Sequence, residues 1–272
     1  MNIGIFFSDI RPFLSDGESR YDLTFSRLRE HGILGLQLRD AEIYEEGEER
    51  LLRAMNRYGL HTEVIHVCIP LMTADHAVFD TAVQYARYTF DLMRRLGCHR
   101  LMVVPRPKTD VKDPADRLRA QQAMLEGFRR ICKSAPDGIE ILAENYSHST
   151  VPFSTVEDME KLLAAAPESR YIFDTGNFFC VNESPRSAYL RLKESLSAVH
   201  VKNCDFSEKG VLVDKGKHMI TLPFRRDTMH LGDLLRQMHR DGIDVPLIME
   251  HNPNTSWEEI LDNAAFLCEI FN

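Results

Sequence analysis

Four residues with metal-binding side chains each close a short apolar run of this sequence. Glu144 ends the run in "IEILAEN", Asp174 lies in "YIFDTG", His200 in "SAVHVKN" and Glu250 in "VPLIMEH". A carboxylate at the end of a buried strand is costly unless a partner offsets its charge. If these runs are neighbouring strands, three carboxylates and one imidazole meet at one point, and their mutual repulsion calls for a divalent cation.

This donor set also limits the choice of metal. It is mostly hard, which favours Mn²⁺ or Mg²⁺, while Zn²⁺, Co²⁺ and Fe²⁺ also accept mixed oxygen and nitrogen ligands. We expect one divalent ion, with Mn²⁺ as the first candidate and Mg²⁺, Zn²⁺ or Co²⁺ as alternatives. The simpler interpretation is four unrelated strand-end residues that cap helices or lie in polar loops. The recurrence of ligand types on four consecutive strands favours the metal site.

The elements that must position these side chains form a regular alternation. Short apolar runs recur eight times, at residues 2–8, 35–39, 62–68, 100–105, 139–145, 171–176, 197–203 and 245–251. Such near-continuous runs are typical of parallel strands covered on both faces. Helix-like segments at 46–57, 76–95, 112–133 and 229–241 lie between them. The pattern predicts the α/β class and a single (β/α)8 TIM barrel domain over residues 1–272.

The sequence also indicates where helices begin, and it can be checked for the main alternative fold, a doubly wound open sheet. Asp113 before Pro114 is an N-cap candidate, and Ser154 with Glu157 has the spacing of a capping box. A doubly wound open sheet would be expected to show a G-x-G-x-x-G turn after its first strand. The stretch "FFSDIRPFLSDGE" has no such turn, so the closed barrel is favoured.

Composition excludes several classes of partner. The formal charge is −8, from 33 Lys plus Arg against 41 Asp plus Glu, which opposes binding to a polyanion, so we expect no nucleic acid partner. No segment approaches the roughly 20 apolar residues of a membrane span, and "MNIGIFF" does not read as a signal peptide. The six cysteines show no C-x-x-C spacing, which is typical of a reducing compartment. We expect a cytoplasmic protein without a membrane partner.

The motifs "AEN", "FDTGN", "VHVKN" and "IMEH" resemble the successive strand ends of the xylose isomerase-like barrel superfamily, the sugar phosphate isomerase/epimerase group. The resemblance implies that Glu144, Asp174, His200 and Glu250 bind one divalent metal ion. Members that interconvert ketoses use the two matching glutamates as acid/base groups on opposite sides of the substrate carbon. This implies catalytic roles for Glu144 and Glu250, and it suggests a homo-oligomer, either a dimer or a tetramer.

The implied chemistry is proton removal alpha to a carbonyl. A metal that holds the carbonyl and hydroxyl oxygens stabilises the enediolate, and carboxylates on both faces allow the carbon centre to be inverted. We therefore expect an isomerase or epimerase acting on a small sugar, sugar acid or polyol. The alternatives are an inosose-type dehydratase on the same metal site and a non-catalytic sugar-binding barrel. Asn177 replaces the His of a "DTGH" motif common among relatives, which argues against a multi-metal nuclease.

Further residues at the strand ends are predicted to bind substrate. His66 lies near the end of the third run, where relatives often place a substrate-contacting histidine. Lys202 lies two positions after His200 and so on the same strand face. Asn145 and Asn177 adjoin metal ligands and are also predicted to contact substrate.

Basic residues elsewhere near the expected mouth have less specific roles. Arg39 and Arg106, at the ends of the second and fourth runs, are expected to form salt bridges of the barrel. Residues 204–228 form a long connection, which is typical of a lid or binding loop. Its basic residues could reach a substrate, or could simply be solvated; they are Lys215, Lys217, Arg225 and Arg226.

Overall fold

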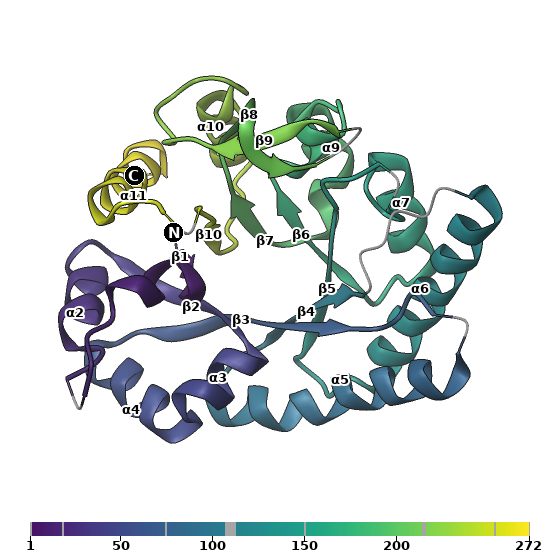
Figure 1. The fold of residues 1–272 in the computed structure, drawn as a ribbon, viewed down its shortest axis with the longest axis horizontal. Helices are drawn as coiled ribbons and strands as arrows, with labels where there is room; N and C mark the ends of the chain where they lie inside the picture. Colours follow the sequence, from purple (N-terminus) through teal and green to yellow (C-terminus); the bar gives the residue numbers. More distant parts are fainter. Residues whose placement is uncertain are drawn as a thin grey trace.

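Eight parallel strands close into a barrel in the order β1-β10-β7-β6-β5-β4-β3-β2 (Figure 1). The computed structural model describes residues 2–17, 19–73, 75–106, 113–149, 151–213, 216–252 and 254–271. The barrel strands are β1 (Ile3–Phe6), β2 (Ile33–Arg39), β3 (His61–Ile69), β4 (Arg100–Pro105), β5 (Glu140–Glu144), β6 (Arg170–Asp174), β7 (Leu196–Val201) and β10 (Leu247–Met249). The prediction of a (β/α)8 TIM barrel is confirmed, and each predicted run overlaps one barrel strand.

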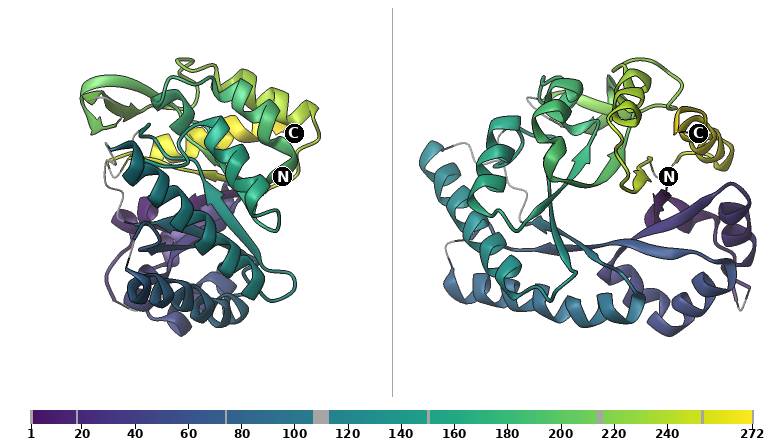
Figure 2. Two further views of the ribbon diagram at one scale, coloured as in Figure 1. Left: turned by 90° about the vertical axis from the view of Figure 1, so that its right-hand side faces the viewer. Right: turned by 180° about the vertical axis from the view of Figure 1, so that it is seen from behind.

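Helices cover the outside of the barrel (Figure 2). They are α1 (Phe7–Ile10), α2 (Asp22–Glu30), α3 (Asp40–Glu46), α4 (Glu48–Tyr58), α5 (His76–Leu96), α6 (Pro114–Ser134), α7 (Val156–Ala165), α8 (Asn177–Cys180), α9 (Pro185–Leu192), α10 (Leu231–Arg240) and α11 (Trp257–Phe271), with short 3₁₀ turns at Arg11–Phe13 and Lys193–Ser195. In the described part of the chain, no helix combines the length and apolar character required to cross a bilayer.

Local sequence signals explain where several helices begin and end. Asp113 caps α6 as predicted, because its Oδ1 accepts a hydrogen bond from the Ala115 amide at 2.8 Å. The prediction of Ser154 as the cap of α7 is wrong by one residue. Thr155 Oγ1 accepts from the Asp158 amide at 3.2 Å, whereas the Ser154 hydroxyl is buried and donates to the Val151 carbonyl at 3.0 Å.

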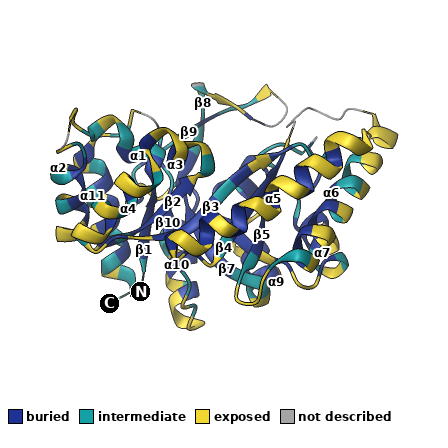
Figure 3. Ribbon diagram, turned by 90° about the horizontal axis from the view of Figure 1, so that it is seen from below, coloured by how far each residue is buried: buried dark blue, intermediate teal, exposed yellow. Residues whose placement is uncertain are grey.

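The helices bury their apolar faces against the outer side of the strands. On α5, Phe79, Val83, Ala86, Phe90 and Met93 recur at helical spacing and are all buried, while the opposite face of that helix is exposed (Figure 3). This leaves the inner face of the barrel to residues that alternate along each strand.

The N-terminal ends of the strands are filled by a polar layer. Glu63, 5% exposed in its side chain, pairs with the Arg100 guanidinium at 3.1 Å, and Arg100 Nε also donates to Ser197 Oγ at 2.9 Å. Glu140 lies 3.5 Å from Arg100 Nε. Gly35 makes room for this layer, because a Cβ at that position would lie 2.5 Å from Glu63 Cγ. The barrel is therefore closed at this end by charged groups that pair with one another.

A two-stranded antiparallel hairpin follows β7 and was not predicted from the sequence. Its strands are β8 (Cys204–Leu212) and β9 (His218–Thr221), and it extends from the side of the barrel opposite the chain termini (Figure 3). Phe206 of β8 stacks on Phe179 with ring centroids 5.1 Å apart. The connection predicted as a loop over 204–228 is thus partly a structured arm that packs against α8.

Candidate metal centre

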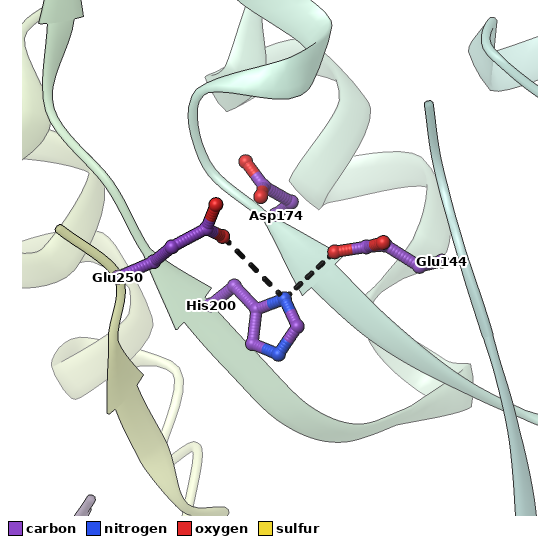
Figure 4. Close-up of side chains that lie close together, drawn as sticks. All are labelled: Glu144, Asp174, His200 and Glu250. Carbon is purple, nitrogen blue, oxygen red and sulfur yellow. Dashed lines mark hydrogen bonds and ion pairs between the residues drawn. The ribbon is translucent and has the colours of Figure 1, made fainter. Parts of the chain in front are cut away.

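The four predicted ligands meet at the C-terminal mouth of the barrel. Glu144 and Asp174 are the last residues of β5 and β6, His200 is the penultimate residue of β7, and Glu250 directly follows β10. Each offers one ligand atom, and these atoms all lie within 4.8 Å of one another. Figure 4 shows the four side chains directed at a common point. Strand closure has therefore assembled one carboxylate or imidazole from each of four adjacent strands.

The backbone around each ligand fixes its position. Asp174 Oδ1 accepts hydrogen bonds from the amides of Gly176 and Asn177, both at 2.8 Å. The Glu250 amide donates to the Val201 carbonyl at 3.0 Å, which continues the sheet pairing one residue beyond β10. The next residue, His251, donates its backbone amide to Asp9 Oδ2 at 2.8 Å. These bonds hold Asp174 by one carboxylate oxygen and fix the backbone at Glu250 and His251.

The orientation of the His200 ring leaves one nitrogen for a cation. Its Nε2 lies 2.8 Å from Gln37 Oε1, which can only accept a hydrogen bond, so Nε2 carries the proton. Its Nδ1 then lies 2.7 Å from Glu144 Oε1 and 3.9 Å from Glu250 Oε2. Two lone pairs cannot face one another at 2.7 Å, so without a metal a proton lies between Nδ1 and Glu144, and a divalent ion bound by both residues would displace it. The donor set fits such an ion in type, and its four ligand atoms lie within 4.8 Å of one another.

Gln37 is a part of this centre that the sequence analysis did not identify. It lies in the middle of β2 and is 1% exposed. A glutamine inside the apolar run "GLQLR" was the available signal, because a buried amide needs hydrogen-bond partners. Metal-bound histidines commonly donate their second ring nitrogen in this way, which fixes the orientation of the ring.

Lys202 supplies the only positive side chain that contacts these carboxylates among the described residues. Its Nζ lies 2.9 Å from Asp174 Oδ2 and 2.8 Å from Glu250 Oε1. Burial tends to lower the pKa of this ammonium, but the charges of Asp174 and Glu250 outweigh burial and raise the pKa well above its usual value. Lys202 is thus a fixed positive charge that spans two of the candidate ligands.

The crowding of negative charge shifts the pKa values of the candidate ligands. Burial, together with the charges of Asp174 and Glu144, raises the pKa of Glu250 to about 7, even though Lys202 opposes the rise. Burial would also raise the pKa of Asp174, but Lys202 and His200 lower it overall. The pKa of His200 is raised, because the hydrogen bond and charge of Glu144 outweigh the effect of burial. Without a metal, the cluster therefore retains protons that a cation would displace.

The remaining predicted substrate residues lie around this cluster. Asn145 Oδ1 accepts from the Tyr171 hydroxyl at 2.5 Å, and its Nδ2 has no hydrogen-bond partner among the described residues. Asn177 Nδ2 donates to the Asn145 carbonyl at 2.9 Å, and its Oδ1 lies 3.4 Å from Lys202 Nζ. His66 Nε2 lies 3.2 Å from Cys68 Sγ on β3. Substrate contact by Asn145, Asn177, His66 and Lys202 stays a prediction.

The basic residues of the 204–228 connection are partly engaged elsewhere. Lys217 Nζ donates to Asn182 Oδ1 at 2.9 Å and lies 4.5 Å from the Phe206 ring centroid. Arg225 pairs with Asp262 at 3.0 Å and with Glu269 at 2.6 Å, both on α11. Lys215 lies outside the described residues. The structure therefore gives Lys217 and Arg225 structural contacts, with Asn182 and Phe206 for the first and with α11 for the second.

Comparison with known proteins places the chain in a family. The sequence profile described as xylose isomerase-like TIM barrel matches residues 25–270. The chain belongs to the xylose isomerase-like TIM barrel family. The family resemblance inferred from the strand-end motifs is confirmed. The sequence has no significant match among curated proteins.

Several solved structures share the fold at low sequence identity. The probable 3-DHS dehydratase AsbF from Bacillus anthracis is 14% identical, with a TM-score of 0.75 over 100% of this chain and 99% of that chain. D-psicose 3-epimerase from Clostridium cellulolyticum H10, solved with D-tagatose, is 11% identical, with a TM-score of 0.74 over 100% of both chains. The IOLI protein, solved with a bound zinc atom, is 12% identical, with a TM-score of 0.77 over 100% of this chain and 98% of that chain. At these identities the likeness concerns the fold alone.

Proposed function

We propose that the protein is a divalent-metal-dependent isomerase or epimerase that removes a proton alpha to the carbonyl of a small sugar, sugar acid or polyol derivative. The observation that supports this most is the meeting of Glu144, Asp174, His200 and Glu250 within 4.8 Å at the barrel mouth. A divalent ion bound there, with Mn²⁺ as the first candidate and Mg²⁺, Zn²⁺ or Co²⁺ as alternatives, would supply positive charge that stabilises an enediolate oxygen.

The chain supplies the proton-transfer groups. Glu144 and Glu250 come from β5 and from the end of β10, which approach the centre from different directions (Figure 4). In this proposal one carboxylate removes the proton and the other returns it to the opposite face of the carbon. The pKa of Glu250, raised to about 7, suits a group that both accepts and donates a proton near neutral pH.

Three neighbours complete the proposed site. The Lys202 ammonium between Asp174 and Glu250 can also donate to a substrate oxygen, as can an N–H of the His66 ring. Asn145 Nδ2 is a buried donor without a partner among the described residues, although Asn145 is fully buried, so its contact would be with a group that enters the cluster itself. A cytoplasmic location and a dimeric or tetrameric state remain parts of this proposal.

The experiment is a substrate screen in deuterated water with Mn²⁺-loaded protein. Ketoses, keto acids and inososes are incubated, and deuterium at a carbon next to the carbonyl is measured by NMR. The proposal predicts incorporation that requires metal and is lost in Glu250→Gln. Loss of water from an inosose would instead favour the dehydratase alternative, because elimination follows the same proton removal. Metal-loaded protein that binds sugars but exchanges no proton would favour a non-catalytic sugar-binding barrel.

A further inference from the structure

Two arginines at the barrel mouth lack the salt bridges expected of them. Arg39 is the last residue of β2 and Arg106 directly follows β4, and both are exposed. Neither forms an ion pair with any residue in the described ranges. Within the described ranges, the expectation that they form salt bridges of the barrel is therefore not met. Many other arginines of the chain pair with carboxylates, but some, such as Arg87, do not do so in the described part of the chain. Arg39 and Arg106 differ from these by their position at the barrel mouth.

Both arginines lie on the inner rim of the mouth. Gln37 of β2 points inward, because it reaches His200, and the two-residue period of a strand places Arg39 on the same face. Arg39 also pairs in register with His66 of β3. The alternation of side chains along β2 and the pairing of Arg39 with His66 both indicate that the Arg39 side chain points towards the opening of the barrel.

Arg106 is anchored at the same rim. Its backbone amide donates to the Ile69 carbonyl at 2.6 Å, and its Nη2 lies 3.7 Å from Cys68 Sγ. Cys68 lies two residues after His66 on the same face of β3, and the two side chains are 3.2 Å apart. Arg39, His66, Cys68 and Arg106 thus form one basic rim along β2, β3 and β4. The metal ligands come from the other strands of the barrel.

The basic rim adjoins the metal centre through β2. Gln37 contacts the His200 ring at 2.8 Å, and Arg39 follows two residues later on the same face of that strand. Arg39 pairs in register with His66, which lies 3.2 Å from Cys68, and Cys68 is a neighbour of Arg106. A small molecule at the centre could therefore extend to the rim.

The sum of charges at the barrel mouth indicates a function for the basic rim. Three carboxylates of the cluster are balanced by the Lys202 ammonium and a divalent ion, so the loaded centre is neutral if His200 is neutral. The Arg39 guanidinium is partly offset by the buried carboxylate of Glu42, on which its charge acts. Arg106 then leaves a positive charge without a carboxylate partner among the described residues, at the mouth of a protein whose formal charge is −8. Guanidinium groups bind carboxylate and phosphate oxygens in paired hydrogen bonds, and a neutral sugar makes no use of such a charge.

We propose that the basic rim is an anion subsite, and that the substrate carries a carboxylate or phosphate at the end remote from its reacting carbon. Arg106 is its main ligand and Arg39 its second. This inference rests on the proposed function, because it assigns the reacting end of the same molecule to the metal centre. It narrows the substrate class to sugar acids and sugar phosphates.

The first test compares three probes that differ only at carbon 6: D-fructose, D-fructuronate and D-fructose 6-phosphate. Binding to Mn²⁺-loaded protein is measured by calorimetry. At least one anionic probe should bind about tenfold or more tightly than D-fructose, since a charged hydrogen-bonded pair contributes at least that much. Which of the two binds better distinguishes a carboxylate from a phosphate. Arg106→Gln should abolish the preference, whereas Arg87→Gln, on the exposed face of α5, should retain it.

The second test needs no substrate, because it uses the reactivity of a thiol in the rim. All six cysteines lie in the described part of the chain, and Cys68 is the exposed one. Iodoacetate and iodoacetamide react with the same thiolate but differ in charge. Their rate ratio at Cys68, read by peptide mass spectrometry, should fall about threefold to fivefold in Arg106→Gln, because one unit charge a few ångströms away is removed. A change in the amount of thiolate alters both rates equally and therefore leaves their ratio unchanged.

Two results would overturn the inference. One is equal binding of all three probes, or no binding of either anionic probe, to protein that binds Mn²⁺. The other is a rate ratio at Cys68 that is the same in Arg106→Gln as in the unaltered chain. Failure of the proposed function looks different: it appears as absence of metal binding or of deuterium exchange, while the rate ratio at Cys68 still reports the positive rim.

Discussion

Charged side chains gather at both ends of this barrel, but only at one end do the side chains that contact one another balance in charge. At the N-terminal end, Glu63 and Glu140 face Arg100 and Arg170, with distances of 3.1 Å between Glu63 and Arg100 and 3.8 Å between Glu140 and Arg170. Two carboxylates meet two guanidiniums there, and each carboxylate has a partner. Such a layer stabilises the fold and needs no further ion.

At the mouth, three carboxylates meet one ammonium. Lys202 contacts Asp174 and Glu250, and Glu144 has His200 as its neighbour. With a neutral imidazole, two negative charges remain without a partner. A single divalent ion removes this excess, whereas adding one to the opposite end would create an excess of positive charge. The comparison shows that the number of unpaired charges, and not the presence of acidic residues, marks the metal centre.

The largest effect should come from removing one charge at each end. Asp174→Asn should weaken Mn²⁺ binding by at least about 100-fold and abolish turnover, because a ligand oxygen and its charge are lost. Glu140→Gln makes the same change at the other end and should leave Mn²⁺ binding unaltered. Calorimetric titration of the two variants checks this. Equal weakening in both would mean that the ends do not differ as described.

For stability, the two ends of the barrel should rank in the opposite order from their ranking for metal binding. Glu63→Gln should lower the free energy of unfolding of the metal-free protein by about 2 kcal/mol, because the partly buried Arg100 guanidinium loses one charged partner and keeps only Glu140. Glu250→Gln should leave that free energy unchanged or raise it, since it removes repulsion among carboxylates. Urea denaturation in the presence of a chelator measures both. If Glu250→Gln is the more destabilising of the two, the mouth is held together by pairing and not strained by excess charge.

Gln37 tests whether the mouth is arranged for a metal. Gln37→Leu should weaken Mn²⁺ binding about 10-fold to 100-fold, because His200 loses the acceptor that fixes its ring. Gln121→Leu is the matched control, since Gln121 donates to Asp158 at 3.0 Å on the outer helices and should have no effect on the metal. Unaltered Mn²⁺ affinity in Gln37→Leu would show that the ring is oriented by other contacts.

The smallest expected effect is a dependence on pH. Glu250 must lose its proton to bind a metal, and its pKa in the metal-free protein is about 7. Apparent Mn²⁺ affinity should therefore fall by at least about tenfold for each pH unit well below 7, because Glu250 loses one proton on metal binding and His200, whose pKa is also raised, loses a second. In Glu250→Gln the slope between pH 6 and 7 should be shallower by one proton. A flat profile in the unaltered chain would contradict the pKa shift.

Much of the centre could be predicted from the sequence for a physical reason. A barrel brings the C-terminal ends of its strands together, so a carboxylate or imidazole at the end of each run is enough to place Glu144, Asp174, His200 and Glu250 near one point. The chain order of the runs gave the strand order, because each parallel strand lies beside the next one along the chain.

The features that escaped prediction depend on contacts across the barrel or between adjacent residues. Gln37 and His200 meet only because β2 and β7 face one another across the barrel, and no local pattern encodes that contact. Ser154 and Thr155 are adjacent hydroxyls, each with an acidic residue three positions later, and burial of Ser154 decided between them. The hairpin of β8 and β9 lies in a segment whose strand signal is interrupted by glycine and charged residues.

The most direct test of the account is an anomalous diffraction measurement on crystals soaked in Mn²⁺. We predict a single strong manganese peak at the mouth, within about 2.0–2.6 Å of one atom from each of Glu144, Asp174, His200 and Glu250. A peak bound elsewhere, or a mouth in which Lys202 keeps both carboxylates and no manganese is present, would contradict the central claim.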